Sequence, residues 1–310
     1  MSALICGSMA YDTIMVFHDK FKNHILPEKV HMLNVSFLVP MIRREFGGCA
    51  GNIAYNLKLL DEKPSIMATV GHDFEPYAQW LNACQISTKL IKTMDDHYTG
   101  QAYITTDEDD NQITAFHPGA MNSSHENSVP EESDYSIGIV SPDGKEGMQQ
   151  HAKEFVKQGI PFIFDPGQGM PMFNGEELIE LLDLATYATF NDYESELMQD
   201  RTGLTLDKIA ERVDALIVTM GGDGSKIYAD GQCIEIPSAQ AKELADPTGC
   251  GDAYRAGLLY GIMNELDWET TGRIASLLGA IKIEHHGTQN HSFTLESFKT
   301  RYNESFGCSF

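Results

Sequence analysis

The chain has 310 residues, of which 42% are hydrophobic and 22% are charged, so it has ample apolar material for one large folded core. Its 22 basic and 45 acidic residues give a formal net charge of −23, and a field of this sign repels nucleic acids and anionic membranes. We therefore expect neither as a partner, and a small anionic ligand would have to be bound by local groups such as backbone N–H groups, helix N-termini or a metal ion.

Targeting signals are not visible in the sequence. The first residues lack the basic start and long apolar run of a signal peptide, and the longest apolar stretches, such as residues 258–263, are too short to cross a bilayer. The six cysteines show no CxxC spacing, which favours free thiols over a disulfide framework. Together these features predict a cytoplasmic protein.

Short apolar segments bounded by Gly, Asp or Pro alternate along the chain with amphipathic segments. This alternation predicts βαβ units, and hence an α/β fold with a mostly parallel central sheet covered by helices on both faces. The predicted strands are 3–6, 66–70, 136–140, 161–164, 186–190 and 216–219; the predicted helices are 50–60, 75–83, 147–157, 176–182 and 206–213, and the chain from residue 252 onward is predicted to be mostly helical.

Two segments interrupt this alternation. Residues 12–46 contain no convincing helix and carry strand-like runs at 14–17 and 35–39, although a long irregular loop is the alternative. Residues 100–118 predict a β-hairpin with strands at 101–106 and 112–116 around the acidic turn 107–111. We therefore predict one domain over residues 1–310, with a small β-sheet lid formed by about 13–46 and 98–118.

The sequence DPTGCGD at residues 246–252 leads directly into an apolar helix. Gly249 and Gly251 leave the surrounding backbone N–H groups accessible, and at a positive helix end these groups can bind an anion. A carboxylate there would repel phosphate, but Asp252 is well placed as a base that accepts a proton from an attacking hydroxyl group, as phosphoryl transfer requires. The alternative is that Asp252 is an ordinary helix N-cap.

Two further motifs lie in the first sixth of the chain. GSMAYD follows the first predicted strand and ends at Asp12, whose carboxylate can accept hydrogen bonds from two sugar hydroxyl groups. GGCAGN precedes a predicted helix and contains Gly48 and Asn52. Either motif alone is equally compatible with a tight turn that has no ligand.

Two more motifs follow later strands. NDYE contains Asn191 and Glu194, whose spacing is also that of a helix capping box. TMGGDG begins at Thr219 and contains Gly221 and Gly224, which would equally suit a hairpin turn. No GxxxxGK[ST] or GxGxxG motif is present, so phosphate binding would depend on these glycine turns.

The motifs and their order resemble those of the ribokinase (PfkB) family over nearly the whole chain. The family's C-terminal signature matches residues 246–252 except at Pro247 and Cys250. The resemblance implies a ribokinase-like three-layer sandwich with a β-sheet lid, and an ATP- and Mg²⁺-dependent kinase, with K⁺ dependence left open. The strings at 24–28, 36–39, 116–121, 165–168 and 287–289 are most similar to bacterial adenosine kinases and broader nucleoside kinases.

The resemblance also implies roles for individual residues. Phe116 would stack on the base and Gln168 would hydrogen-bond its edge, although lid packing is an alternative for Phe116. Residues 285–289 would lie beside the nucleotide and a monovalent-cation site. The implied catalytic residues are Asp252, Gly249, Cys250 and Gly251; the substrate-binding residues are Ser8, Asp12, Ser36, Gly48, Asn52, Phe116 and Gln168; the nucleotide-binding residues are Asn191, Thr219, Gly221 and Gly224; Glu194 would hold Mg²⁺ through water, and Asp246 would belong to a K⁺ loop.

The predicted reaction is phosphorylation of the 5′-hydroxyl group of a purine nucleoside such as adenosine, inosine or guanosine. Ala102 stands where adenosine kinases are expected to have a second lid aromatic residue, which favours a broader substrate range. The alternatives are a PfkB-type sugar kinase acting on ribose or fructose, and a non-catalytic nucleoside or nucleotide sensor. The exposed edges of a lid sheet predict a homodimer formed through the lid.

Overall fold

The computed structural model describes residues 2–25, 34–109, 111–131 and 134–310. The residues from 26 to 33 in the predicted lid segment, and Asp110 in the predicted acidic turn, lie outside the described residues. So does the end of the string at 24–28.

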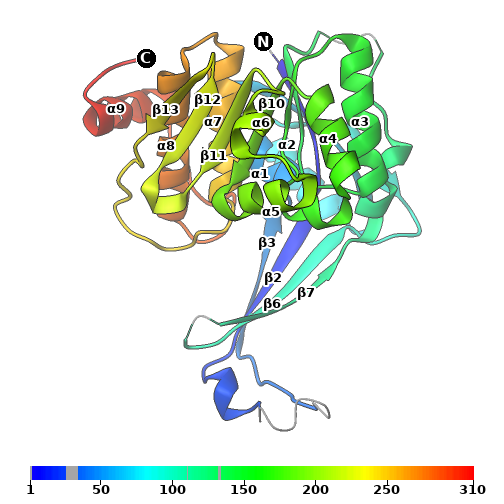
Figure 1. The fold of residues 1–310 in the computed structure, drawn as a ribbon. Helices are drawn as coiled ribbons and strands as arrows, with labels where there is room; N and C mark the ends of the chain where they lie inside the picture. Colours follow the sequence, from blue (N-terminus) through cyan, green and yellow to red (C-terminus); the bar gives the residue numbers. More distant parts are fainter. Residues whose placement is uncertain (1, 26–33, 110, 132–133) are drawn as a thin grey trace.

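A nine-stranded sheet forms the centre of the body (Figure 1). Its order is β13-β12-β11-β10-β9-β8-β1-β4-β5, and every pairing from β11 to β5 is parallel. The predicted mostly parallel sheet is therefore confirmed, with antiparallel strands at one edge. The strands are β1 (Ser2–Cys6), β4 (Lys63–Gly71), β5 (Ser87–Met94), β8 (Ile137–Val140), β9 (Phe162–Phe164), β10 (Tyr187–Asn191), β11 (Ala215–Thr219), β12 (Ser225–Ala229) and β13 (Gln232–Ile236).

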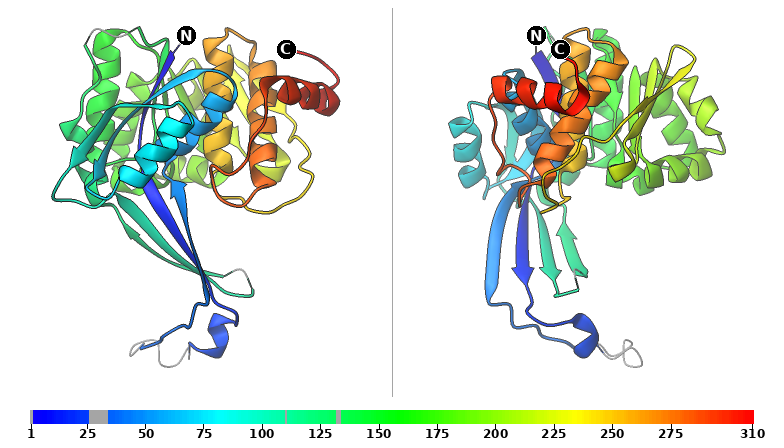
Figure 2. Two further views of the ribbon diagram at one scale, coloured as in Figure 1. Left: turned by 180° about the vertical axis from the view of Figure 1, so that it is seen from behind. Right: turned by 90° about the vertical axis from the view of Figure 1, so that its left-hand side faces the viewer.

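Helices cover both faces of this sheet (Figures 1 and 2). One layer contains α3 (Lys145–Gln158), α4 (Gly175–Leu184), α5 (Asp192–Thr202) and α6 (Leu206–Ala210); the other contains α1 (Cys49–Leu59), α2 (Glu75–Ala83), α7 (Cys250–Met263), α8 (Trp268–Ile283) and α9 (Leu295–Phe306). Within the described residues, no helix is both long enough and apolar enough to span a membrane.

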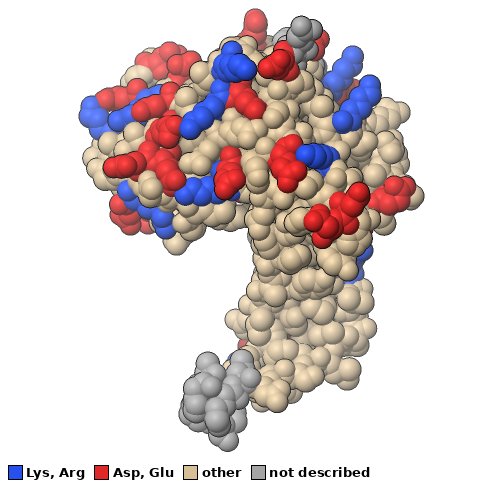
Figure 3. Space-filling view, turned by 90° about the vertical axis from the view of Figure 1, so that its right-hand side faces the viewer, with Lys and Arg blue, Asp and Glu red and all other residues tan. Residues whose placement is uncertain are grey.

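A second sheet projects from the body and has the order β3-β2-β6-β7 (Figure 1). Its strands are β2 (Ala10–Val16), β3 (Met41–Gly47), β6 (Gly100–Thr106) and β7 (Gln112–His117). The side of this sheet seen in Figure 3 shows few charged side chains, unlike the body above it. The hairpin predicted at 100–118 is confirmed; that the sheet acts as a lid stays a prediction.

The strand predicted at 35–39 is wrong. Residues 34–39 have no regular secondary structure, and the strand begins after Pro40, at Met41. The strand lies later in the sequence than predicted because the partner of β2 is the segment from Met41 to Gly47: Ala10 pairs with Gly47, and Val16 pairs with Met41. Most of β3 is exposed, so its side chains need not alternate between apolar and polar residues, and Arg43, Arg44 and Glu45 concealed it from pattern-based prediction.

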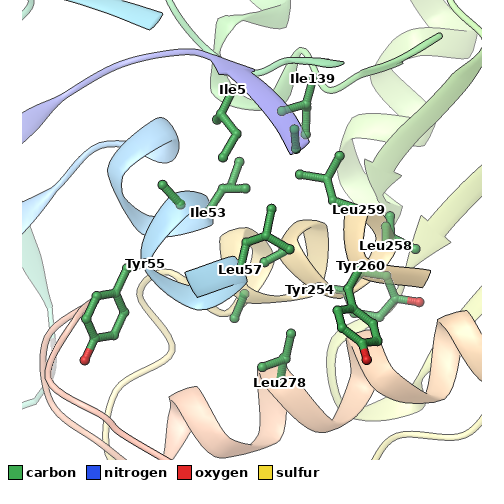
Figure 4. Close-up of a cluster of buried hydrophobic side chains, with 14 of the residues drawn as sticks. Ile5, Ile53, Tyr55, Leu57, Ile139, Tyr254, Leu258, Leu259, Tyr260 and Leu278 are labelled. Carbon is green, nitrogen blue, oxygen red and sulfur yellow. The ribbon is translucent and has the colours of Figure 1, made fainter. Parts of the chain in front are cut away.

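Both faces of the main sheet are buried, which explains the uninterrupted apolar character of its strands. In β1, Ala3 and Ile5 belong to the core beneath α1, α7 and α8, whereas Leu4 and Cys6 belong to the opposite core. Figure 4 shows the first of these cores, where Ile5 lies close to Ile53 of α1. This packing fixes α1 and α7 against each other, and both helices begin at the same end of the sheet.

Candidate active site

Most of the predicted site residues lie at the carboxyl ends of the parallel strands, where ligands bind in open α/β sheets. Ser8 follows β1, and the β10–β11 register places Asn191 directly beside Thr219. The first residues of α1 and α7 complete this edge, and the second sheet joins the body there through β2 and β3.

Gly249 is the N-cap of α7 and has a left-handed backbone conformation, with φ of 78°. A Cβ atom at this position would lie 3.0 Å from Cγ2 of Thr288, so both the conformation and the space require glycine. The N–H group of Cys250 donates to the carbonyl oxygen of Pro247 at 3.2 Å. The first-turn N–H group of Gly251 has no intrahelical acceptor, as at any helix start, and can therefore bind an anion.

Asp252 is not an N-cap residue, because it is the third residue of α7 and its side chain makes no cap. Instead, Oδ2 of Asp252 accepts a hydrogen bond of 2.8 Å from Nδ2 of Asn52 on α1. Burial raises the pKa of Asp252 to about 6; the Asn52 hydrogen bond opposes this shift, and the nearby Asp165 carboxylate adds to it. The group is thus mostly ionised at neutral pH and has a basicity suited to general-base catalysis.

A hydrogen-bond network fixes the orientation of the Asn52 amide. Nε2 of Gln289 donates to Oδ1 of Asn52 at 3.0 Å and contacts the Tyr77 hydroxyl oxygen at 2.6 Å, while Nε1 of Trp80 donates to Oε1 of Gln289 at 2.9 Å. With Oδ1 accepting, the Nδ2 group must face Asp252. Sequence reasoning missed Tyr77 and Trp80, since both look like ordinary core residues of an amphipathic helix.

Arg255 is a third residue of the candidate site that sequence reasoning missed. It lies one turn after Asp252, is buried, and forms a bidentate ion pair with Asp165 through bonds of 3.1 and 3.0 Å. Its Nη2 atom is also 3.9 Å from Oε2 of Glu194. An arginine within an otherwise apolar helix could have indicated this ion pair, because a buried guanidinium group must be paired with an acidic group.

Asn191 and Glu194 form the capping box that the sequence allowed. The Glu194 N–H group donates to Oδ1 of Asn191 at 2.7 Å, and the Asn191 N–H group donates to Oε2 of Glu194 at 2.8 Å. Burial and the Asp165 carboxylate raise the pKa of Glu194, and Arg255 opposes them. These contacts use Oε2, so a role for the other carboxylate oxygen in metal binding is compatible with the capping box.

The Thr219 loop is compact and rich in glycine. Gly221 and Gly224 have φ of 55° and 90°, and residues 221–223 form a short 3₁₀ turn between β11 and β12. A Cβ atom on Gly221 or Gly222 would meet nothing within 4 Å, so the backbone of this turn is open on its outer side. The turn lies beside Asn191 and its backbone is accessible, so it could bind phosphate groups at this edge of the sheet.

On the opposite side of Asp252, Gly48 brings α1 against the end of β1. It has φ of 87°, and a Cβ atom there would lie 2.6 Å from the Ser8 carbonyl oxygen. The Ser8 hydroxyl group accepts a bond of 3.2 Å from the Cys49 N–H group. Burial raises the pKa of Asp12 to about 6, and the carboxylates of Glu45 and Asp246 add to this shift.

The structure brings together only part of the predicted substrate-binding set. Phe116 pairs with Ala102 across β6 and β7, and Ala102 pairs with Asp12, so these residues share one face of the second sheet. Ser36, however, is exposed in the irregular segment 34–39, and its neighbour Phe37 packs in an aromatic cluster with Phe17. Gln168 is exposed at the start of the 3₁₀ segment Gly167–Met172.

Asp246 ties two loops together. Its carboxylate accepts hydrogen bonds from the Thr248 N–H group at 2.9 Å and the Gly287 N–H group at 3.0 Å. Burial alone would raise the pKa of Asp246, but these bonds hold it below the ordinary value. In the part of the chain that the structure describes, no group of three or more His, Cys, Asp or Glu side chains is arranged to hold a metal ion.

Comparison with known proteins gives consistent results. Residues 9–294 match the model of the pfkB family carbohydrate kinases. The nucleoside kinase of Methanocaldococcus jannaschii is 33% identical over 266 residues, which cover 85% of this chain and 87% of that protein. Its solved structure, described as an archaeal member of the ribokinase family, superposes with a TM-score of 0.89 at 31% identity over 98% of both chains.

The nucleoside kinase of Burkholderia thailandensis in complex with inosine is more similar still. It is 50% identical, with a TM-score of 0.91, and the match covers 99% of both chains. The same kinase has also been solved with ADP and inosine, and that structure has a TM-score of 0.88. These matches confirm the predicted ribokinase-like fold.

Proposed function

Because the chain belongs to the pfkB family of carbohydrate kinases, we propose that its site transfers the γ-phosphoryl group of ATP to the 5′-hydroxyl group of a purine nucleoside. The observation that carries this proposal is the Asp252 carboxylate at the start of α7, held by Asn52 and given a pKa of about 6 by its surroundings. The chain is a phosphotransferase with an alcohol acceptor, and similarity to nucleoside kinases, one of them bound to inosine, favours a nucleoside over a free sugar.

In the proposed reaction, the nucleoside 5′-oxygen attacks the γ-phosphorus atom while its proton passes to Asp252. The bond between the γ-phosphorus and the β–γ bridging oxygen breaks, and ADP leaves. The open N–H group of Gly251 and the positive end of α7 stabilise charge on the transferred group. The Cys250 N–H group donates to the Pro247 carbonyl oxygen, so in this structure Cys250 helps to shape the turn and its N–H group is not available to the phosphate.

The nucleotide would lie across the ends of β10 and β11. Asn191, Thr219, Gly221 and Gly224 form the adjacent loops there, as described above. Mg²⁺ supplies charge neutralisation on the phosphates when bound. Such an ion is held mainly by phosphates and water, with only one or two protein carboxylates, and the half-buried Glu194 beside Arg255 suits that role through a water molecule.

The nucleoside would lie between the two glycine turns and the second sheet. Ser8, Asp12, Gly48 and Asn52 line the ribose side, where the Asp12 carboxylate would accept hydrogen bonds from the sugar hydroxyl groups. We propose that the second sheet closes on the substrate as a lid, bringing Phe116 to the base. Such closure would exclude water and protect ATP from hydrolysis. Ser36, in the irregular segment 34–39, would approach the substrate with this movement, whereas Gln168 lies on the body beside Gly167, near Glu194.

A homodimer formed through the lid is also proposed. Seven large apolar side chains of the lid segments are exposed, each by at least 43% of its surface: Leu38, Met41, Ile42, Tyr98, Tyr103, Ile113 and Phe116. Figure 3 shows this projecting sheet largely free of charge on one side. By register, Ile42, Tyr103 and Ile113 share the face of the sheet opposite to that of Asp12 and Phe116, and a second copy with the same surface would bury these three groups. Light scattering at micromolar concentration tests this, and a monomer there would refute it.

We further propose that the protein works in the reducing cytoplasm. All six cysteines are free in the structure, and free thiols persist in that compartment.

The function is tested by ADP release from MgATP with adenosine, inosine, guanosine, cytidine, ribose and fructose. Turnover with nucleosides and none with free sugars is expected. Turnover with ribose or fructose alone would overturn the nucleoside assignment but leave the kinase chemistry intact. Asp252→Asn is expected to retain nucleoside binding and to lose most turnover, and near-normal turnover in this variant would rule out Asp252 as the base.

A further inference from the structure

Lys282 is a fully buried cation beneath the proposed anion site. It lies in the last turn of α8, and its relative exposure is 0%. Lysine is almost never fully buried unless its ammonium group is paired, because the loss of hydration is costly. The mechanism proposed above does not use this residue, so its burial requires a separate explanation.

The Lys282 ammonium group binds backbone oxygens from two different loops. Nζ donates to the carbonyl oxygen of Asp246 at 2.7 Å and to that of His285 at 3.2 Å. The same two loops are joined again by the Asp246 carboxylate, which accepts the Gly287 N–H group. Lys282 therefore sits where the anion-site loop and the 285–289 loop meet.

Both loops reach the reacting centre. One continues from Asp246 to Gly249 and Asp252, and the other continues to Thr288, which limits the space at Gly249, and to Gln289, which orients Asn52. A shift between the two loops would therefore displace the N-cap of α7 and the partner of the catalytic carboxylate together. Lys282 fixes their relative position.

The charge of Lys282 also matters at this position. Asp246 and Asp252 lie near it, as does the Cys250 thiol, and Arg43 is the other nearby cation. Burial lowers the pKa of Lys282, whereas Asp246 and Cys250 oppose this shift. A positive charge below the helix start would favour an anion above it, in a chain whose net charge is −23.

We propose that the Lys282 ammonium group takes the place of a monovalent cation, so that this kinase needs no K⁺. Backbone carbonyl oxygens are the ligands through which proteins replace the hydration shell of K⁺, and here an ammonium group with three donors already binds two of them. The proposal rests on the kinase function proposed above, and it replaces the K⁺ loop that the family resemblance implied at Asp246.

The first test uses the wild-type protein in KCl or choline chloride at equal ionic strength. Both nucleoside-dependent ADP release and the melting temperature are expected to be the same in the two salts. A several-fold stimulation of turnover by K⁺, or a melting temperature raised specifically by K⁺, would overturn the proposal. Because melting requires no substrate, this readout remains valid even if the nucleoside assignment fails.

The second test is Lys282→Met, which keeps the apolar stem and removes the donors. Without the ammonium group the two loops lose this link and the anion site loses a nearby positive charge, so turnover in choline chloride should fall about tenfold or more. KCl should partly restore turnover and raise the melting temperature of this variant. Full turnover without K⁺ would show that the ammonium group is dispensable.

Lys92→Met is the matched control, because Nζ of Lys92 also donates to a backbone carbonyl oxygen, that of Glu126 at 3.0 Å, away from the site. It should show normal turnover and no response to K⁺. If Lys282→Met does not fold, Lys282→Gln replaces it, and the wild-type salt comparison alone still decides the proposal.

Discussion

Replacing Asn52 by leucine should move the pH dependence of turnover. In the wild-type protein, kcat/KM, whose pH profile reports groups of the free enzyme, should fall with decreasing pH around a midpoint of about 6, because only the ionised Asp252 carboxylate accepts a proton. The Asn52 amide donates to this carboxylate and therefore favours its charged form. Leucine has a similar volume but no donor, so the midpoint must rise.

The size of the shift follows from the hydrogen bond. A hydrogen bond to a charged group contributes about 1.5–3 kcal/mol, and one pKa unit corresponds to about 1.36 kcal/mol. The midpoint should therefore rise by about 1–2 pH units, to about 7–8. At pH 7 the ionised fraction would fall from about nine tenths to between about one half and one tenth.

The assay is kcat/KM for ADP release against pH; weaker ribose binding in the variant lowers kcat/KM at every pH but leaves its midpoint in place. The control is Asn264→Leu at the other end of α7, where Nδ2 of Asn264 donates to Oε1 of Glu62 at 3.0 Å. This variant removes the same kind of bond about 18 Å away along the helix and should keep the wild-type midpoint. An unchanged midpoint in Asn52→Leu would show that the titrating group is not Asp252.

Three further predictions concern stability. At pH values above 6, Asp252→Asn should raise the melting temperature. The pKa of Asp252 is about 6 in the folded protein and 3.8 ordinarily, so ionisation of this group destabilises the folded state by at most about 3 kcal/mol. A gain in melting temperature that persists undiminished at pH 4 would contradict this. Gly203→Ala should cost about 1–2 kcal/mol because this glycine is left-handed, and Gly249→Ala should cost at least as much because a Cβ atom there would also lie 3.0 Å from Thr288. Only Gly249→Ala should lose turnover, and equal turnover in the two variants would argue against the anion site. Arg255→Met should lower the free energy of unfolding in urea by about 3–5 kcal/mol, because it leaves Asp165 buried and unpaired, and a loss below 1 kcal/mol would mean that Asp165 is solvated.

Much of the central sheet could be predicted because its strands are buried on both faces and are bounded by Gly, Asp or Pro residues, which end regular structure. β5, β12 and β13 were not predicted, since each lies near an edge and mixes charged with apolar residues. Helix α5 was also missed: it buries only Ser195 and Met198, so the sequence carries almost no periodic apolar signal. Pattern reasoning therefore fails where burial is one-sided or slight.

The local geometry of the candidate site was predictable where one motif contains it, as at Gly249 and Asp252 at the start of α7. It was not predictable where function depends on pairs distant in sequence, such as Arg255 with Asp165, because single-sequence reasoning does not reveal contacts. The roles of Ser36 and Gln168 came from resemblance alone, and in this structure both side chains are exposed.

The hydrogen bonds of Asn52 join segments of the chain that are synthesised at different times. Asn52 bonds to Asp252, 200 positions later, and to Gln289, 237 positions later. At about 5–20 residues per second, roughly 12–47 s separate the synthesis of Asn52 from that of Gln289. A nascent chain on the ribosome can therefore form the first glycine turns without a complete catalytic centre, so unfinished chains are not expected to consume ATP.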